Sequence, residues 1–385
     1  MRRKLNMGMI GGGNDAFIGA VHRIAANIDG HIQLVCGAFS SNPQKSKESG
    51  EALYLPEERV YSTYAEMIEK ERELPAGERM DFVSIVTPNH LHFAPAKMAL
   101  ENGFDVLLDK PMTLTLEEAK ALKKIIDSTG RTFCLTHTYT GYPMIKEAKE
   151  LIKAGKLGAI KKIYVEYPQG WLSTFLEGSD NKQAAWRTDP SRSGIAGCMG
   201  DIGTHAFNLA EYVSGLHVTK LCADINITVP GRQLDDDGTV LLKFDSGASG
   251  MLYATQVAAG EENNLRINIY GEKGGIFWKQ EDANSLVVKW LDKPSEIYRA
   301  GSGYLSTLAK HNCRVPAGHP EGYLEAFANI YRNFALTLLA QKNNAEVMEP
   351  WKDFPGVEEG IRGMAFIENV IASGKSETKW KFFEV

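Results

Sequence analysis

The ten residues MGMIGGGNDA, at positions 7–16, decide the fold of the first part of the chain. Gly11, Gly13 and Ala16 form a G-x-G-x-x-A pattern here, between a short apolar run and an amphipathic stretch. Glycine lets a backbone approach a pyrophosphate closely, and a helix N-terminus offers free N–H groups and a positive dipole end. A tight strand-to-helix turn without a ligand would have the same pattern, so the surrounding sequence has to decide between the two.

The surrounding sequence alternates short apolar runs with amphipathic stretches through the first third of the chain. The apolar runs predict strands near 5–11, 32–39, 81–87, 104–109 and 131–136. The amphipathic stretches predict helices near 17–28, 43–51, 64–73, 91–102 and 115–128. Such an α/β alternation is typical of a doubly wound parallel sheet, and it favours a dinucleotide site at the glycines. The residues expected to contact the dinucleotide are Gly11, Gly13, Asn14, Ala16, Phe17 and Ile18.

The pattern changes after residue 136, where strands of period two, separated by turns, replace the alternation. We therefore expect two domains, a dinucleotide-binding Rossmann domain over 1–136 and an α+β domain over 137–385. The second domain should contain a large, mostly antiparallel open sheet. Long helices are expected near 322–341 and 357–373, and they can pack back on the first domain.

Composition and charge exclude several classes of protein. The chain has 385 residues, 43% hydrophobic and 24% charged, which is an ordinary globular composition with enough length for two cores. A formal net charge of -5, with no long block of one sign, argues against a nucleic-acid partner. No apolar run is long enough to predict a transmembrane helix. The 5 scattered cysteines lack a CxxC pair, so we expect reduced thiols in a cytoplasmic protein.

Two short motifs that could suggest a metal are interpreted otherwise. His90-x-His92 has no evident third ligand. The run Asp235-Asp236-Asp237-Gly238 lacks the alternating ligands and the terminal Glu of a calcium loop, so it predicts a turn. We expect no bound metal.

The end of the second expected strand bears on the choice of dinucleotide. An acidic residue that would hold the ribose 2′-hydroxyl is missing from the stretch AFSSN, at positions 38–42. Ser40 and Ser41, close to Lys45, could instead accommodate a 2′-phosphate, which leans toward NADP. A solvated helix face would also explain the lysine, so NAD and NADP both stay open.

Three further motifs follow in order: VTPNHLH at 86–92, VLLDKP at 106–111 and GDIGTH at 200–205. With the glycine loop, they resemble the family of glucose-fructose oxidoreductase, inositol dehydrogenase and rhizopine-catabolism proteins (Gfo/Idh/MocA), over nearly the whole chain. The second motif usually reads Glu-Lys-Pro in that family, whereas here it is Asp109-Lys110-Pro111. The departure is conservative because the lysine is kept.

The resemblance implies an NAD(P)-dependent dehydrogenase or reductase that acts on a secondary alcohol or ketone of a sugar, glycoside or cyclitol. It implies cofactor contacts from Thr87, Pro88, Asn89, His92, Asp109 and Lys110. It also implies a homodimer or homotetramer, assembled through the open face of the second domain's sheet.

The residue chemistry supports the same catalytic assignment. Oxidation of an alcohol requires a base for the hydroxyl proton and a donor or cation for the developing alkoxide. Asp201 and His205 stand four residues apart near the start of an expected helix, so their side chains should face one way. An imidazole ordinarily titrates near pH 6.5, which makes His205 the better base. Lys110, at the carboxyl end of a strand, can polarise the reacting oxygen.

Substrate contacts are expected from Lys110, Asp201 and His205, and from aromatic and basic residues near them. Aromatic faces pack against sugar rings, and Arg or Asp forks bind hydroxyls. The long, polar and irregular segment 168–200 lies just ahead of the third motif. The additional candidates are Tyr139, Trp171, Trp186, Arg187 and His319, for each of which a packed aromatic or a loop histidine is the alternative.

Two other functions remain open. Some relatives of this fold cleave glycosides with a tightly bound NAD through transient oxidation and reduction, and the same three residues would serve there. A non-catalytic sugar or nucleotide sensor could also use the fold, but such a protein is expected to lose Lys110, Asp201 and His205, which are all present.

Overall fold

The computed structural model describes residues 3–14, 16–178 and 181–385. Contacts within the chain divide it into two units. The first comprises Met1–His137 with Phe327–Ile361, and the second comprises Thr138–Ala326 with Arg362–Val385.

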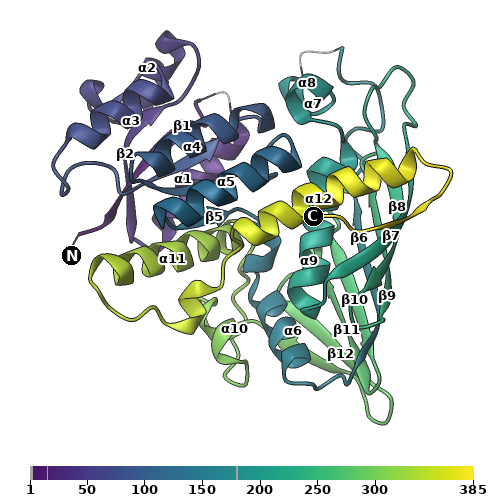
Figure 1. The fold of residues 1–385 in the computed structure, drawn as a ribbon. Helices are drawn as coiled ribbons and strands as arrows, with labels where there is room; N and C mark the ends of the chain where they lie inside the picture. Colours follow the sequence, from purple (N-terminus) through teal and green to yellow (C-terminus); the bar gives the residue numbers. More distant parts are fainter. Residues whose placement is uncertain (1–2, 15, 179–180) are drawn as a thin grey trace. The chain divides into compact units, whose positions relative to one another are not determined.

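The first unit is built on a five-stranded sheet with the order β2-β1-β3-β4-β5, in which all pairs are parallel (Figure 1). Its strands are β1 (Leu5–Gly11), β2 (Ile32–Ala38), β3 (Phe82–Val86), β4 (Asp105–Leu108) and β5 (Phe133–Leu135). Its helices are α1 (Phe17–Ile28), α2 (Pro43–Ala52), α3 (Tyr64–Glu73), α4 (Phe93–Glu101), α5 (Leu116–Thr129), most of α11 (Tyr323–Lys342) and the start of α12 (Val357–Gly374). The expected doubly wound parallel sheet is confirmed.

Local sequence explains where these helices begin and end. Thr63 and Thr115 accept hydrogen bonds from the backbone N–H groups of Glu66 and Glu118, as N-caps do. Asn42 caps α2 in the same way, and Gly130 ends α5 in the left-handed conformation.

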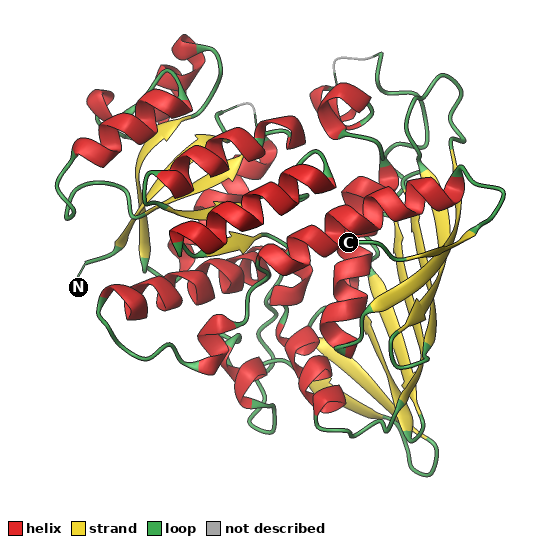
Figure 2. Cartoon of the chain, in the orientation of Figure 1, coloured by secondary structure: helices red, strands yellow, loops and turns green. Residues whose placement is uncertain are grey.

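Helices cover both faces of this sheet (Figure 2). All residues of β3 are buried, which is why the strand reads as a continuous apolar run. On one face, the ring of Phe334 on α11 packs edge-on against Phe82, with 5.2 Å between centroids. A late helix therefore belongs to the core of the first unit.

The second unit contains a nine-stranded sheet with the order β13-β12-β11-β10-β6-β9-β8-β7-β14. Only the β6–β9 pair is parallel among the described strands of this sheet. The strands are β6 (Ile160–Pro168), β7 (Val218–Asn226), β8 (Asp237–Phe244), β9 (Ser249–Thr255), β10 (Arg266–Gly271), β11 (Gly274–Lys279), β12 (Ser285–Trp290), β13 (Glu296–Arg299) and β14 (Trp380–Phe382). The helices are α6 (Pro143–Lys153), α7 (Lys182–Arg187), α8 (Pro190–Ser193), α9 (Thr204–Ser214), α10 (Thr307–His311) and the rest of α12.

The two faces of the nine-stranded sheet differ. Helices pack on one face (Figure 2), where register partners such as Ile163, Ile269 and Ile276 form a buried row. On the other face, one row of register partners crosses all nine strands and is exposed or half-buried throughout. This open-face row consists of Ile297, Val287, Phe277, Asn268, Tyr164, Met251, Leu241, Cys222 and Trp380.

Three expectations about local structure need correction. The segment 168–200 contains the short helices α7 and α8, started by the side-chain caps of Asn181 and Asp189, and is not irregular throughout. A π-helical turn, Met199–Gly203, precedes α9, so Asp201 and His205 do not share an α-helix. The run at 235–238 is not a tight turn, because the chain enters β8 at Asp237.

No helix among the described residues is both long and apolar enough to cross a membrane. In the same part of the chain, no three side chains of the His, Cys, Asp or Glu type lie together as metal ligands would.

Candidate functional site

The glycine loop lies at the carboxyl end of β1 in the first unit, where the backbone needs glycine. Gly11 and Gly12 have φ angles of +80° and +70°. A Cβ at Gly11 would lie 2.9 Å from Thr87 Cγ2, and one at Gly13 would lie 2.9 Å from Ser49 Oγ. The loop therefore has no room for side chains, as a backbone cradle for phosphate requires. Asp15, within the loop, lies outside the described residues.

Helix α1 starts directly after this loop. Ala16 at its N-cap makes no side-chain capping bond, and the N–H groups of a helix's first turn are suited to bind an anion. Of the expected contact residues, Asn14 and Phe17 are exposed, while Ala16 and Ile18 are half-buried. Phe17 is 71% exposed, which is unusual for a phenylalanine next to a core.

A contact between Gly12 and Gly19 brings α1 close to β1, and sequence reasoning missed both residues. A Cβ at Gly19 would lie 2.4 Å from the Cα and carbonyl oxygen of Gly12. Arg23 also donates from Nη1 to the Gly12 carbonyl oxygen at 2.6 Å. Gly19 therefore allows the close packing of α1 against the glycine loop. A glycine inside the first turns of a predicted helix was the available signal.

The motif at 86–92 leaves β3 at the same edge of the sheet, because Val86 is the register partner of Gly11. His92 is buried and holds this motif to the next one. Its Nε2 lies 2.8 Å from the Thr87 carbonyl oxygen and its Nδ1 lies 2.8 Å from that of Pro111. Burial lowers the pKa of His92, and the two carbonyl contacts partly oppose this. His92 thus orients the loop that contains Thr87, Pro88 and the buried Asn89.

Asp109 and Lys110 follow β4, and the Lys110–Pro111 peptide is cis. The carboxylate Oδ1 of Asp109 accepts hydrogen bonds from Thr136 Oγ1 at 2.7 Å and from the Lys110 backbone N–H at 2.9 Å. The acid of this motif therefore ties the end of β4 to the end of β5. Buried His137 lies close enough to the Lys110 ammonium to feel its charge, and burial together with this charge lowers the pKa of His137 to about 3.

Of the expected 2′-phosphate residues, Ser40 and Ser41 lie between β2 and α2, and Lys45 lies in the first turn of α2. Ser41 and Lys45 are exposed, and Ser40 is half-buried. Ser40 Oγ accepts the Asn42 backbone N–H at 3.1 Å, inside the turn that begins α2. The neighbouring Lys47 forms an exposed ion pair with Glu57 at 2.5 Å.

The first unit therefore fits a dinucleotide on its own geometry. A side-chain-free loop, an uncapped helix N-terminus and two motif loops share the carboxyl edge of a parallel sheet, where such folds bind nucleotides. Gly11–Asn14 would hold the pyrophosphate, and the loops at Thr87 and Asp109 would flank the nicotinamide half.

Asp201 and His205 belong to the second unit, at the start of α9. Asp201 Oδ2 accepts from Gln256 Nε2 at 2.9 Å and lies 3.4 Å from Arg187 Nε. His205 is buried, and its ring meets the Tyr139 ring edge-on, with 4.8 Å between centroids. The two residues thus have different neighbours: Asp201 contacts an amide and a guanidinium, whereas His205 contacts an aromatic ring.

Tyr139 belongs to a buried network of phenol and amide groups. Its hydroxyl contacts the hydroxyl of Tyr167, at the end of β6, and accepts from Asn263 Nδ2 at 3.2 Å. Tyr167 in turn donates to Asn263 Oδ1 at 2.7 Å. Burial raises the pKa of Tyr139, so the phenol stays protonated and can act as a donor.

Sequence reasoning missed Gln256 and Asn263. Both are polar residues in loops that follow or precede strands, and nothing in their local sequence distinguishes them from solvated loop residues. Gln256 is nevertheless 3% exposed and bonded to Asp201. Only the pairing of strands that are distant in sequence brings them to the site.

The remaining substrate candidates have mixed surroundings. The Arg187 guanidinium stacks 4.4 Å from the Trp186 ring centroid and also contacts Asp201, so this pair belongs to the Asp201 group. Trp171 Nε1 donates to Gln169 Oε1 at 3.1 Å. His319 is exposed, and its Nδ1 lies 3.2 Å from the Pro316 carbonyl oxygen within its own loop.

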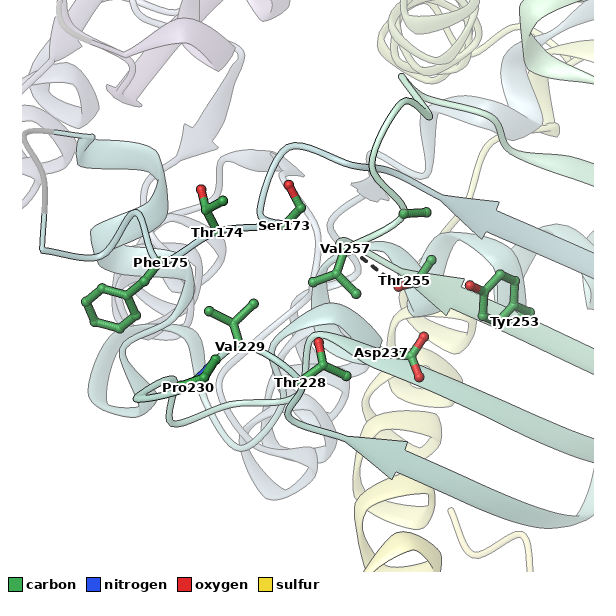
Figure 3. Close-up of a pocket in the computed structure, with 11 residues that line it drawn as sticks. Ser173, Thr174, Phe175, Thr228, Val229, Pro230, Asp237, Tyr253, Thr255 and Val257 are labelled. Atoms are coloured by element: carbon green, nitrogen blue, oxygen red, sulfur yellow. Dashed lines mark hydrogen bonds between the residues drawn. The ribbon is translucent and has the colours of Figure 1, made fainter.

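A hollow of about 770 Å³ opens nearby in the second unit, and its lining does not include Asp201 or His205 (Figure 3). Asp237 and Tyr253, on neighbouring strands, form one side, and loop residues such as Phe175 and Val229 form the other. The full lining is Ser173, Thr174, Phe175, Thr228, Val229, Pro230, Asp237, Tyr253, Thr255, Val257 and Ala258.

Family models match both parts of the chain. Residues 5–137 match an oxidoreductase family with an NAD-binding Rossmann fold, and residues 145–277 match the GFO/IDH/MocA C-terminal domain.

Relatives of known sequence or structure match over nearly the full length. The uncharacterised oxidoreductase YfiI of Bacillus subtilis is 30% identical, over 99% of this chain and 98% of its own. An oxidoreductase from Sinorhizobium meliloti has a crystal structure with 43% identity and a TM-score of 0.89, covering 99% of this chain and 100% of its own. An inositol dehydrogenase homolog from Azotobacter vinelandii, complexed with NAD+, shares 31% identity with a TM-score of 0.94, covering 100% and 98%. The same homolog complexed with NADH and myo-inositol gives 29% identity and a TM-score of 0.91, again covering 100% and 98%.

Proposed function

The chain belongs to the Gfo/Idh/MocA family of NAD-binding oxidoreductases, and we propose that it transfers hydride between a nicotinamide dinucleotide and a secondary alcohol of a sugar or cyclitol. The myo-inositol complex of the Azotobacter vinelandii homolog supports a polyol substrate.

One observation carries the proposal: buried His205 stands one turn after an Asp201 that is held by an amide and a guanidinium. A polyol has many hydroxyl groups and needs many fixed donors and acceptors. Gln256, Asn263 and Tyr139 supply amide and phenol groups next to this pair. A buried imidazole among such groups is suited to take the proton of one hydroxyl.

We assign the roles as follows. His205 accepts the hydroxyl proton, and Asp201 hydrogen-bonds a neighbouring hydroxyl or orients the reacting one. Lys110 donates to the reacting oxygen and stabilises its negative charge as the C–H bond breaks. The bound dinucleotide accepts the hydride. His137, whose pKa is lowered to about 3, is neutral at working pH and adds no positive charge beside Lys110.

The test is turnover with a panel of inositols, aldoses, ketoses, anhydrosugars and glycosides, followed by nicotinamide absorbance. At least one polyol should give net cofactor reduction, and Lys110→Ala and His205→Ala should each lower kcat by about 100-fold or more. The exposed Lys97→Ala and His217→Ala serve as matched controls in the same two units. Full activity in the Lys110 and His205 variants would refute the assignment, and sugar release from a glycoside without net reduction would favour the glycosidase alternative.

For the cofactor, we propose a preference for NAD(H). The complex of the Azotobacter vinelandii homolog with NAD+ supports this. In this chain, Ser40 Oγ accepts a backbone bond and Lys47 is paired with Glu57, so these two groups already have partners. We expect kcat/KM to be at least about 10-fold higher with NAD+ than with NADP+. The reverse ratio would assign the 2′-phosphate to Ser41 and Lys45.

We further propose that the open-face row lies in a contact between copies of the chain, as a homodimer or homotetramer. Leu241 and Ile297, near opposite edges of the sheet, are 45% and 54% exposed, and aromatic side chains lie between them. An apolar strip of this length on a soluble protein is typical of an interface. A cytoplasmic location is also proposed, which the buried thiols of Cys36, Cys134 and Cys198 support.

A further inference from the structure

Three consecutive aspartates, Asp235, Asp236 and Asp237, stand where the chain enters β8 in the second unit. The first two are buried, at 6% and 1% exposure, whereas Asp237 is half-buried on the open side of the sheet. Buried carboxylates are costly unless hydrogen bonds satisfy them, so their partners show what they hold in place.

Asp235 holds the backbone that leads into the Asp201 turn. Its two carboxylate oxygens accept the backbone N–H groups of Gly197 and Met199, each at 2.7 Å. Its carbonyl oxygen accepts the N–H of Cys198 at 2.8 Å. Gly197 in turn accepts the Asp201 N–H at 2.9 Å. A Cβ on Gly197 would lie 2.3 Å from the Asp235 carbonyl oxygen, so the two segments leave no room for a side chain between them.

Asp236 holds a different loop and a buried arginine. One oxygen accepts the N–H and the hydroxyl of Thr228, at 2.8 and 2.9 Å. The other accepts the Val229 N–H at 3.0 Å and Arg232 Nη1 at 3.2 Å. The Arg232 side chain is 1% exposed, so its charge depends on Asp236 and on Glu177, which lies 2.6 Å from Nε.

Arg232 uses its remaining donors to hold the segment that follows Trp171. Nη1 donates to the Leu172 carbonyl oxygen at 2.9 Å, and Nη2 donates to that of Thr174 at 3.0 Å. The two loops held by this pair, at 173–175 and 228–230, form one side of the hollow in Figure 3. The side chains of the Arg232–Asp236 pair therefore hold these two loops and not the backbone of the Asp201 turn.

Gln256 joins the two arrangements at Asp201. Its backbone N–H donates to the Asp236 carbonyl oxygen at 2.9 Å, and its own carbonyl oxygen accepts the Leu172 N–H at 3.0 Å. Its side chain donates to Asp201. Gln256 thus connects the Asp201 turn and the loop after Trp171 to the start of β8.

We propose that Asp235 and the Arg232–Asp236 pair are positioning groups with separate tasks: Asp235 fixes the Asp201–His205 turn, and the pair fixes the loop after Trp171, a candidate sugar contact. The inference rests on the proposed function. A small displacement of a reacting group lowers turnover, whereas a loosened binding loop raises KM.

The kinetic test uses the substrate found in the panel and compares Asp235→Asn, Arg232→Met and the control Asp245→Asn, at an exposed aspartate directly after β8 that does not line the hollow. Asp235→Asn should lower kcat about 10-fold or more with KM changed less than about 3-fold. Arg232→Met should raise KM about 10-fold with kcat changed less than about 3-fold. Asp245→Asn should leave both constants near those of the natural protein. The proposal would be overturned if Asp235→Asn and Arg232→Met changed kcat by the same factor and KM by the same factor.

Milder variants cover the case in which removal of a buried charge prevents folding. Gly197→Ala keeps the Asp235 carboxylate but pushes the Gly197 segment away from Leu234 and Asp235, and Thr228→Val removes the hydroxyl bond to Asp236. They should show the same split, with kcat lowered in the first and KM raised in the second. A split in the opposite sense would also overturn the proposal.

Hydrogen exchange separates this inference from the proposed function, because it needs no substrate. Asp235→Asn should speed amide exchange in 197–199 and leave exchange in 172–177 unchanged. Arg232→Met should speed amide exchange in 172–177 and leave exchange in 197–199 unchanged. This result together with no turnover of any panel member would refute the proposed function and leave the separate tethers standing. Uniform exchange changes in both segments would refute the separate tethers.

Discussion

The imidazole Nδ1 of His22 lies 2.7 Å from the phenol oxygen of Tyr331, although 309 residues separate the two in sequence. The same phenol contacts Ser84 Oγ at 2.8 Å, and His22 Nε2 lies 3.9 Å from Asp109 Oδ1. The helix after the glycine loop, a late helix and the Asp-Lys-Pro motif thus meet around one buried imidazole.

We predict that protonation of His22 destabilises the first unit in mild acid. Burial lowers the pKa of His22 from 6.5 to about 4, so the unfolded chain binds the proton more readily than the folded chain. The stability from neutral His22 is fully present above pH 6.5 and is lost as the pH falls toward 4, by about 3 kcal/mol in total. Urea unfolding at several pH values should show a shallower acid dependence for His22→Gln than for the natural chain. Tyr331→Phe keeps the imidazole and serves as the control, and identical slopes in His22→Gln and the natural chain would contradict the prediction.

Gly19→Ala should weaken dinucleotide binding. The added methyl group would lie 2.4 Å from the Gly12 backbone, so α1 has to move away from the loop at a cost of about 1–3 kcal/mol. We expect the Kd for NADH, measured by fluorescence, to rise about 10-fold and the Tm to fall. Gly77→Ala is the matched control, because its Cβ meets nothing within 4 Å. Unchanged binding in Gly19→Ala would show that the loop does not depend on this contact.

Thr136→Val should lower kcat with little effect on cofactor affinity. Thr136 donates to Asp109 at 2.7 Å, and the same carboxylate oxygen accepts the Lys110 N–H. Loss of the hydroxyl costs about 1 kcal/mol and frees Asp109 to turn, which displaces Lys110. We expect kcat to fall about 3- to 10-fold while the Kd for NADH changes less than about 2-fold. Thr132→Val is the control, since that hydroxyl bonds to Gln341 instead; an equal loss of kcat in both variants would exclude a specific role.

Leu241→Asp should dissociate the proposed oligomer, because it places a charge within the open-face row. Light scattering after size exclusion should give a smaller mass for this variant than for the natural chain. Leu291→Asp, at a residue that is 82% exposed and outside the row, should leave the mass unchanged. A natural chain that is already monomeric would refute the proposed interface directly.

The sequence predicted most of the fold because its signals are periodic and local. All five parallel strands and their helices were found from apolar runs and from caps such as Thr63 and Thr115. Helices α7 and α8 were not predicted, since six and four residues are too few for a periodic pattern. The π-helical turn before α9 was also missed, because the residues around Asp201 have the composition of an ordinary helix start.

The site was predictable only where a motif marks it. The glycine loop, Lys110, Asp201 and His205 stand in recognisable motifs. Gln256, Asn263 and Gly19 acquire their roles through contacts with residues far away in sequence, and no local pattern reports such contacts. The aspartate run at 235–237 predicts a turn from its local sequence, because the partners of the Asp235 carboxylate lie 38 and 36 residues earlier.

Residues 327–361 complete the first unit, and this has a consequence for how the protein is made. The ribosome releases the N-terminal residues first, so β1 to β5 emerge long before α11, whose Phe334 covers Phe82. The part of the nascent nucleotide-binding sheet that α11 covers therefore stays apolar and uncovered until residues 327–342 have been synthesised, a state that attracts chaperones and favours aggregation. A premature stop anywhere before residue 327 would leave the N-terminal half as an exposed fragment and not as a smaller working domain.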